Sequence, residues 1–262
     1  RELDARGVTQ LTLVPSLLKT LLEAGQGERA RWLRSIYSSG EALHLSGLER
    51  FTECFPYARL FNIYGSTEMG ADVTYAEVET ENLPAEAVGL WAPIGKGIDN
   101  TQAYVLDPDG QMTVSGAIGE LHVGGVCLSR GYFERAGLTA ERFIPDPFGG
   151  PGDRLYRTGD LARWRADGVV EYVGRADHQV KIRGFRIELG EIEARLSQQA
   201  GVRAAVVIAR EAGAGRQLVG YVAGEAVLDG AELRTALSSV LPDYMVPARI
   251  MVLAQLPLTP NG

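Results

Sequence analysis

The first hundred residues alternate between two hydrophobic patterns. Short apolar runs predict buried strands, and apolar positions that recur every three or four residues predict amphipathic helices. Strands are expected at residues 8–14, 33–38 and 58–64, and helices at 16–24 and 44–55. This alternation, with short connections, is typical of a parallel sheet covered by helices. Residues 1–93 therefore predict the end of a doubly wound α/β subdomain, in which ligands bind beyond the carboxyl ends of the strands.

The pattern changes twice further along the chain. Residues 94–176 hold short alternating segments and turn signals, which predict hairpins or a small β-barrel-like region with a long surface loop at 143–153. In the remainder, Val180, Ile182 and Ile187 alternate on either side of Gly184 and predict a hairpin. Helices are then expected at 189–199 and 230–241, and strands at 204–209, 217–223 and 248–253. We therefore divide the chain into a core at 1–176 and a small α+β subdomain at 177–262.

Composition narrows the class of protein. Of the 262 residues, 45% are hydrophobic and 23% are charged, as in ordinary soluble globular proteins. A formal net charge of −7 argues against a sequence-independent nucleic-acid binder, and no apolar run is as long as a membrane span. Cys54 and Cys127 lack metal-ligand spacing and form a poor disulfide framework. We expect a cytoplasmic protein with both thiols in the core, and no nucleic-acid or membrane partner.

Polar groups gather in the loop that follows the third predicted strand. The amide of Asn62 and the ring of Tyr64 could hold a purine, and the hydroxyl of Thr67 with the carboxylate of Glu68 could bind Mg²⁺. The same Thr67 and Glu68 could instead simply cap a helix. Similarly, Asp160 could accept both hydroxyls of a ribose or could bond its own turn.

Other polar features are less specific. The hairpin face that carries Lys181 and Arg183 suits an anionic ligand, although exposed basic side chains are usually only solvated. The three histidines share no ligand spacing with one another or with the cysteines, and no nucleophilic triad is evident. Metal-ligand clusters and covalent catalysis therefore find no support in the sequence.

Seven segments in a fixed order carry a family resemblance. They are residues 62–68, 119–125, 128–132, 138–143, 156–160, 174–188 and 241–247. In this order they resemble the later motifs of the adenylation domains of nonribosomal peptide synthetases, within the superfamily of adenylate-forming ligases. The resemblance covers nearly the whole chain. It implies ATP-dependent formation of an aminoacyl-AMP, followed by transfer to the phosphopantetheine thiol of a peptidyl carrier domain.

The resemblance also implies roles for individual residues. Thr67 meets the phosphates and Glu68 holds Mg²⁺, while Ser66 stands where the family usually has proline. The nucleotide contacts are Gly40, Glu41, Ala42, Asn62, Tyr64, Gly65, Asp160, Tyr172 and Arg175. Asp177 is the hinge of a mobile C-terminal subdomain. After adenylation, its rotation brings the hairpin of Lys181 and Gly184 to the active site for thiol attack.

The amino-acid pocket is placed by the same resemblance. Its residues in this chain are Thr12, Tyr37, Ser39, Ile63, Ala71 and Asp72. A buried Asp72 carboxylate would be costly without a donor or a positive charge, which favours a polar or cationic substrate. Alternatively, Tyr37 or Ser39 could satisfy Asp72 and leave room for an apolar substrate.

Further partners and alternatives follow from the resemblance. The 138–143 segment resembles the surface where some synthetases bind a small MbtH-like protein, with Ala136 and Ala140 as its shallow site, although an ordinary helix with surface alanines would look the same. A condensation domain is another candidate partner. The alternatives are an acyl- or aryl-CoA ligase of the same superfamily and a catalytically dead docking module. Residues 119–121, 139–143 and 189–193 favour the peptide-synthetase branch, and the intact nucleotide ligands argue against the dead module.

Some family features fall outside the sequence. The glycine-rich phosphate loop and the aspartate that grips the substrate amino group belong upstream of Arg1, and the catalytic lysine would follow Gly262. We therefore expect this chain to be a piece of a longer protein and to form adenylate poorly by itself.

Overall fold

The computed structural model describes residues 2–25, 30–80, 90–212, 215–224 and 228–257. The chain divides into two compact units, residues 1–177 and 178–262, which are described separately. Among the described residues, no helix is long and apolar enough to cross a membrane.

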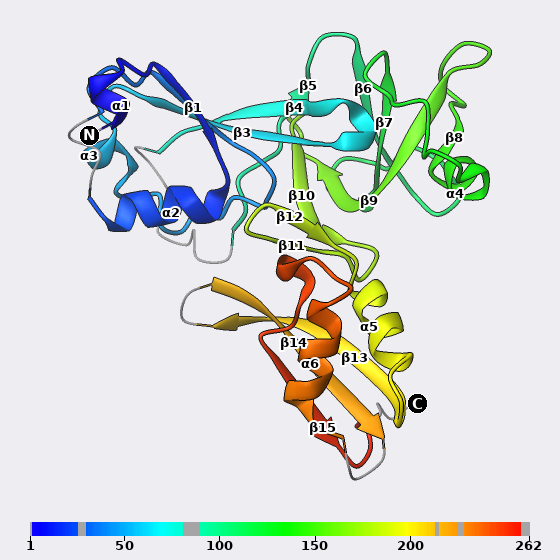
Figure 1. Ribbon diagram of the computed structural model, residues 1–262. Coiled ribbons are helices and arrows are strands. Elements are labelled where there is room, and N and C mark those ends of the chain that lie inside the picture. The colour runs from blue at the N-terminus through cyan, green and yellow to red at the C-terminus, as the bar shows by residue number, and fades with distance from the viewer. Residues whose placement is uncertain (1, 26–29, 81–89, 213–214, 225–227, 258–262) are drawn as a thin grey trace. The chain divides into compact units, whose positions relative to one another are not determined.

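The first unit begins with a five-stranded sheet in the order β1-β2-β3-β4-β5 (Figure 1). Its strands are β1 (Gln10–Leu13), β2 (Ser35–Ser38), β3 (Arg59–Ser66), β4 (Ala71–Val78) and β5 (Lys96–Gly97). The first three strands pair in parallel, as the alternating pattern predicts, and the last two pairings are antiparallel. The short helices are α1 (Glu2–Ala5), α2 (Pro15–Glu23), α3 (Phe51–Cys54) and the 3₁₀ turn η2 (Thr67–Met69). Leu18 and Leu22 of α2 pack with Ile36 and Leu60 in the core of this sheet.

The helix predicted at 44–55 is largely wrong, because only Phe51–Cys54 is helical. The backbone N–H of Leu45 donates to the carbonyl of Leu90 at 3.0 Å, and that of Ala92 donates to Leu43 at 2.7 Å. Backbone pairing with a distant segment therefore replaces the first turns of the helix. Leu48, Phe51 and Phe55 still reach the core, so their hydrophobic spacing reflects burial rather than helix.

The rest of the first unit is an antiparallel sheet in the order β10-β9-β7-β6, with β8 also paired to β9. Its elements are β6 (Thr101–Leu106), β7 (Ile118–Gly125), α4 (Ala136–Arg142), β8 (Phe143–Pro145), β9 (Arg154–Trp164) and β10 (Val170–Arg175). Phe143–Pro145 pairs with β9, so the predicted 143–153 loop begins as a strand. Tyr64 and Met69 from the first sheet region share a core with Leu121 and Tyr156. This shared core holds the end of β3 against the antiparallel sheet.

The second unit packs two helices with a three-stranded sheet in the order β13-β14-β15. Its elements are β11 (Val180–Ile182), β12 (Phe185–Ile187), α5 (Leu189–Ser197), β13 (Val202–Ala212), β14 (Gly215–Gly224), α6 (Gly230–Ser238), the 3₁₀ turn η3 (Asp243–Met245) and β15 (Arg249–Leu253). Ile192 and Leu196 of α5 and Leu237 of α6 are fully buried with Val222 of β14.

The predicted hairpin around Gly184 is confirmed. Ile182 pairs with Phe185, so Arg183 and Gly184 form a two-residue turn with φ of +53° and +79°. Positive φ at both central positions defines a type I′ turn, which glycine adopts without strain. The ring of Phe185 stacks on Tyr244 of η3 with centroids 4.2 Å apart and planes 4° from parallel.

Candidate active site

Asn62 lies at the middle of β3 with its side chain buried. Its Nδ2 atom donates to the carbonyl of Ala92 at 3.3 Å and to that of Pro93 at 2.8 Å. These bonds use the amide nitrogen, so Oδ1 is the atom of this amide that can accept an N–H from a ligand. An exocyclic amino group of a purine fits that requirement.

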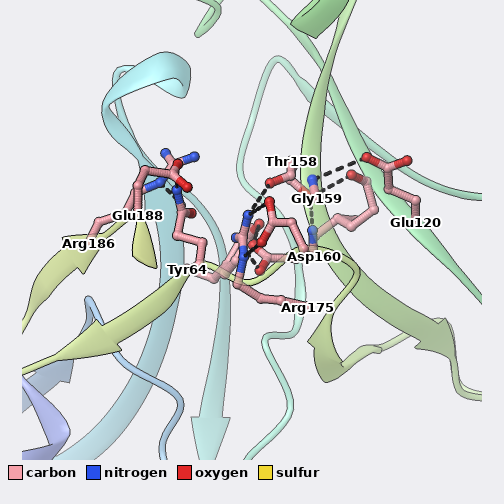
Figure 2. A network of polar contacts seen from close by, with 11 residues as sticks. Tyr64, Glu120, Thr158, Gly159, Asp160, Arg175, Arg186 and Glu188 are labelled. Atoms are coloured by element: carbon pink, nitrogen blue, oxygen red, sulfur yellow. Dashed lines mark hydrogen bonds and ion pairs between the residues drawn. The ribbon is translucent and has the colours of Figure 1, made fainter. Parts of the chain in front are cut away.

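Two residues further on, Tyr64 joins a network that spans three strands. Its hydroxyl donates to Oδ2 of Asp160 on β9 at 2.6 Å, and Nη1 of Arg175 on β10 donates to Oδ1 of the same carboxylate at 2.7 Å (Figure 2). Arg175 also holds Asp177 in a two-pronged ion pair, with Nε and Nη2 donating at 2.6 and 2.7 Å. One residue predicted for each of adenine, ribose and the hinge, namely Tyr64, Asp160 and Asp177, therefore lies in one continuous network.

The centre of this network is withdrawn from solvent. The side chains of Arg175 and Asp160 are only 8% and 4% exposed. Burial, followed by the charge of Asp160, raises the pKa of Tyr64 well above its usual value, so the phenol stays a neutral donor at neutral pH. Burial opposes the charged form of Arg175, but the hydrogen bonds and charges of the two aspartates outweigh it and raise the pKa of the guanidinium.

Backbone and side-chain bonds around Thr158 set the position of Asp160. The Thr158 hydroxyl donates to the carbonyl of Leu121 at 2.7 Å and accepts from the Asp160 N–H at 3.0 Å. Next to it, the Gly159 N–H donates to Glu120 at 3.2 Å (Figure 2). Sequence reasoning missed Glu120 and Thr158 as supporting residues, although both lie in the quoted motif segments.

The Thr67–Glu68 pair forms the η2 turn directly after β3. Oε1 of Glu68 accepts a hydrogen bond from the Tyr132 hydroxyl at 2.8 Å. In the described part of the chain, no group of three or more His, Cys, Asp or Glu residues could enclose a metal ion. A single carboxylate beside a hydroxyl nevertheless fits Mg²⁺, which commonly takes one or two carboxylates and completes its octahedron with phosphates and water.

The segment after β2 and the strand β10 meet through aromatic rings. His44 packs against Trp91 with centroids 3.7 Å apart, and Trp91 meets Tyr172 edge-on at 6.1 Å. Oε2 of Glu41 accepts from the backbone N–H of Ser16, at the start of α2, at 2.9 Å. His44, close behind the predicted contacts Gly40, Glu41 and Ala42, therefore links this segment to Tyr172 through Trp91. Sequence reasoning did not single out Trp91.

The predicted pocket residues come from four neighbouring strands and from Ser39, directly after β2. Thr12 pairs with Tyr37, whose ring stacks on Phe61 at 5.3 Å. Across the β3–β4 pair, Ala71 and Asp72 face Ser66 and Gly65. Ile63 alternates with Asn62 and Tyr64 along β3, so it faces the opposite side of the sheet. Ser39 Oγ donates to Oδ1 of Asp72 at 2.7 Å, so the carboxylate has a partner inside the protein.

Within the second unit, Lys181 lies on β11 opposite Arg186 of β12. Arg186 Nε donates to Oε1 of the buried Gln179 at 2.6 Å, and Gln179 donates in turn to Glu188 (Figure 2). Hydrogen bonds among these polar side chains therefore hold the base of the basic hairpin, and Gly184 lies at its tip.

Comparison with known proteins identifies the family. The family description "AMP-binding enzyme" matches residues 1–133, and "AMP-binding enzyme C-terminal domain" matches residues 191–262. A dimodular nonribosomal peptide synthase of Bacillus subtilis (strain 168) is 49% identical over 270 residues, covering all of this chain and 11% of that protein. The chain thus spans about a tenth of that relative's length.

Two solved structures have the same fold. The crystal structure of IdnL1 is 34% identical with a TM-score of 0.85, covering 98% of this chain and 52% of that one. Holo-PA1221, a nonribosomal peptide synthetase protein containing adenylation and peptidyl carrier domains bound to a vinylsulfonamide inhibitor, is 30% identical with a TM-score of 0.85, covering 98% of this chain and 44% of that one. Matches along both units, together with the fold, show that this chain belongs to the AMP-binding enzyme family.

Proposed function

We propose that this chain is part of an adenylation domain that activates an amino acid. The amino-acid carboxylate attacks the α-phosphate of ATP to give aminoacyl-AMP and pyrophosphate, and a carrier thiol then displaces AMP to give a thioester. The observation that carries the proposal is the hydrogen-bonded network of Tyr64, Asp160, Arg175 and Asp177. It joins the expected nucleotide residues to the expected hinge.

The network suits the binding of a nucleoside. Tyr64 offers its ring to adenine and Asn62 offers Oδ1 to the adenine amino group. Asp160 already bonds Tyr64 and Arg175, but an ionised carboxylate has about four acceptor positions, so it can also receive ribose hydroxyls. Gly40, Glu41, Ala42, Gly65 and Tyr172 complete the proposed nucleotide contacts. In a reaction that is mostly positioning and charge neutralisation, this fixed frame is the chain's main contribution.

Thr67 and Glu68 would hold the phosphate side of the substrate. In the proposed site, Thr67 bonds a phosphate and Glu68 is the carboxylate ligand of Mg²⁺. When bound, Mg²⁺ neutralises charge on the phosphates. The chain's own residues supply the turn that presents both groups directly after β3.

The second half-reaction would use the small unit. Arg175 grips Asp177 at the last residue of the first unit, so rotation about Asp177 is the proposed movement. Because one pocket cannot hold departing pyrophosphate and an incoming pantetheine arm together, the movement separates the two steps. Lys181 and Gly184 of the hairpin would then face the thiol of the peptidyl carrier domain.

For the substrate side chain, we propose a polar or cationic group. Asp72 supplies a carboxylate, and its bond to Ser39 uses one of several acceptor positions, so a substrate donor can still bind. Thr12, Tyr37, Ile63 and Ala71 would form the remaining wall of the amino-acid pocket.

A condensation domain and an MbtH-like protein are proposed partners. Helix α4, which has no buried residues, would contact the MbtH-like protein.

Pyrophosphate exchange tests this function on the complete protein that contains the chain. A panel of amino acids, aryl acids and fatty acids is supplied with ATP, and the activated acid is then offered to either a carrier domain or free coenzyme A. We expect exchange with a polar or cationic amino acid and loading of the carrier. Preference for leucine, valine or phenylalanine would refute the substrate class. Loading of coenzyme A alone would favour an acyl-CoA ligase, and absence of exchange would favour a docking module.

A further inference from the structure

The segment 128–132 lies against the turn that carries Thr67 and Glu68. The Ser129 N–H donates to the carbonyl of Glu68 at 2.8 Å, and the Ser129 hydroxyl donates to the carbonyl of Thr67 at 3.1 Å. These partners are about sixty residues apart in sequence. A motif to which the proposed function assigns no role thus fixes the backbone of the proposed phosphate and metal turn.

Tyr132 extends this contact to the side chain of Glu68. Its hydroxyl donates to Oε1 of the carboxylate at 2.8 Å. The ring packs edge-on against Phe143 with centroids 5.8 Å apart. The contact is therefore a directed hydrogen bond from a tyrosine whose ring is packed in place.

Further contacts hold the backbone of this tyrosine. The Tyr132 N–H donates to Oγ1 of Thr139, in α4, at 3.0 Å. A Cβ at Gly131 would lie 2.4 Å from the Thr139 side chain, and its φ is +142°, so this close approach requires glycine. The guanidinium of Arg154 donates to the carbonyls of Ser129 and Arg130, both at 3.0 Å. Helix α4 and strand β9 thus determine where the phenol points.

We infer that Tyr132 is a positioning residue that sets the direction of the Glu68 carboxylate for its cation, an inference that rests on the proposed function. Glutamate has several rotatable bonds, and a hydrogen bond to one oxygen selects among its rotamers. Partners of metal ligands commonly change metal affinity about 10–100-fold when they are removed. Tyr132 itself needs no contact with the nucleotide or the amino acid.

The test compares Tyr132→Phe with wild type in the complete protein. Tyr104→Phe is the matched control, because it also removes one tyrosine hydroxyl from the first unit, at a position on β6, and keeps the ring packed on Phe148 at 4.9 Å. ATP binding is measured by calorimetry over a series of Mg²⁺ concentrations and in excess chelator, and Mn²⁺ binding by electron paramagnetic resonance. For Tyr132→Phe we expect the half-saturating metal concentration to rise about tenfold, with metal-free ATP binding unchanged. The control should match wild type.

Each outcome decides the inference. An unchanged metal requirement in folded Tyr132→Phe would overturn it, and so would an equal loss of metal-free ATP binding, which indicates general damage to the site. If Tyr132→Phe does not fold, Thr139→Val, which removes only the tether to α4, should show the same shift in metal requirement, and no shift would overturn the inference. If wild type neither binds ATP nor exchanges pyrophosphate, the proposed function fails and this inference falls with it.

Discussion

Replacement of Asp160 by alanine should weaken the first unit as well as nucleotide use. The substitution removes the acceptor that Asp160 supplies to the Tyr64 hydroxyl and one of the two carboxylates that face Arg175. Arg175 keeps its two-pronged pair with Asp177 and a bond to the carbonyl of Thr158. The buried guanidinium therefore loses one of its two negatively charged partners but keeps the other hydrogen bonds.

The magnitude follows from burial. An unsatisfied buried hydroxyl costs about 1–3 kcal/mol, and a lost hydrogen bond to a charged group costs about 1.5–3 kcal/mol. Complete loss of a partner from a buried ion pair costs about 3–5 kcal/mol, an upper bound here because Asp177 remains. We expect the free energy of unfolding to fall by about 3–5 kcal/mol. For a unit of this size, the melting temperature should fall by roughly 6–20 °C.

Tryptophan fluorescence makes this measurement specific. The three tryptophans, Trp32, Trp91 and Trp164, all lie in the first unit, so the thermal transition of their emission reports that unit alone. In the complete protein, the same substitution should lower the use of ATP in pyrophosphate exchange several-fold to hundreds-fold, the effect of losing about 1–3 kcal/mol of binding.

Asp160→Asn separates the two effects. The amide keeps one acceptor oxygen but loses the charge, so it should melt between wild type and Asp160→Ala. A tryptophan transition of Asp160→Ala within about 2 °C of wild type would refute the structural reasoning, because it would mean a loss of less than about 1 kcal/mol. Wild-type ATP affinity and exchange would refute the ribose assignment.

Other substitutions test separate parts of the molecule. Burial lowers the pKa of His122 below its usual 6.5, so the unfolded chain binds the proton first. The stability that is present above pH 6.5 should therefore be lost as the pH falls towards the native pKa of His122. In His122→Gln, the melting temperature should depend less on pH over this range. A double-mutant cycle of Phe185→Leu and Tyr244→Leu should give a coupling of about 0.5–1.5 kcal/mol by circular dichroism, with tryptophan emission unchanged; zero coupling would contradict the stack. Gly184→Asp should preserve adenylate formation and reduce thioester formation, and equal loss of both in a folded variant would contradict the rotation.

Local patterns in the sequence determined much of the architecture. Short apolar runs located β1, β2 and β3 within a few residues, although burial alternates along each of these strands. The alternation around Gly184 located the β11–β12 hairpin. The ordered motifs indicated the family, which the comparisons confirm. The roles assigned to single residues stay predictions.

Periodicity failed where a distant segment competed for the backbone. Residues 44–55 show helical spacing, yet Leu43 and Leu45 pair with Leu90 and Ala92, and only Phe51–Cys54 is helical. Hydrophobic spacing records which side chains are buried. It does not record which backbone groups satisfy one another, so pairing between distant segments is invisible to it.

Only the tertiary structure decided the partners of the site residues. Tyr64 and Asp160 are 96 residues apart, and Ser39 and Asp72 are 33 apart, yet each pair shares a hydrogen bond. The sequence by itself determined which chemical groups are available and which strands carry them. Strand order and register determined which groups meet, because a hydrogen bond requires its two atoms within about 3 Å, and only the folded sheet brings such distant positions that close.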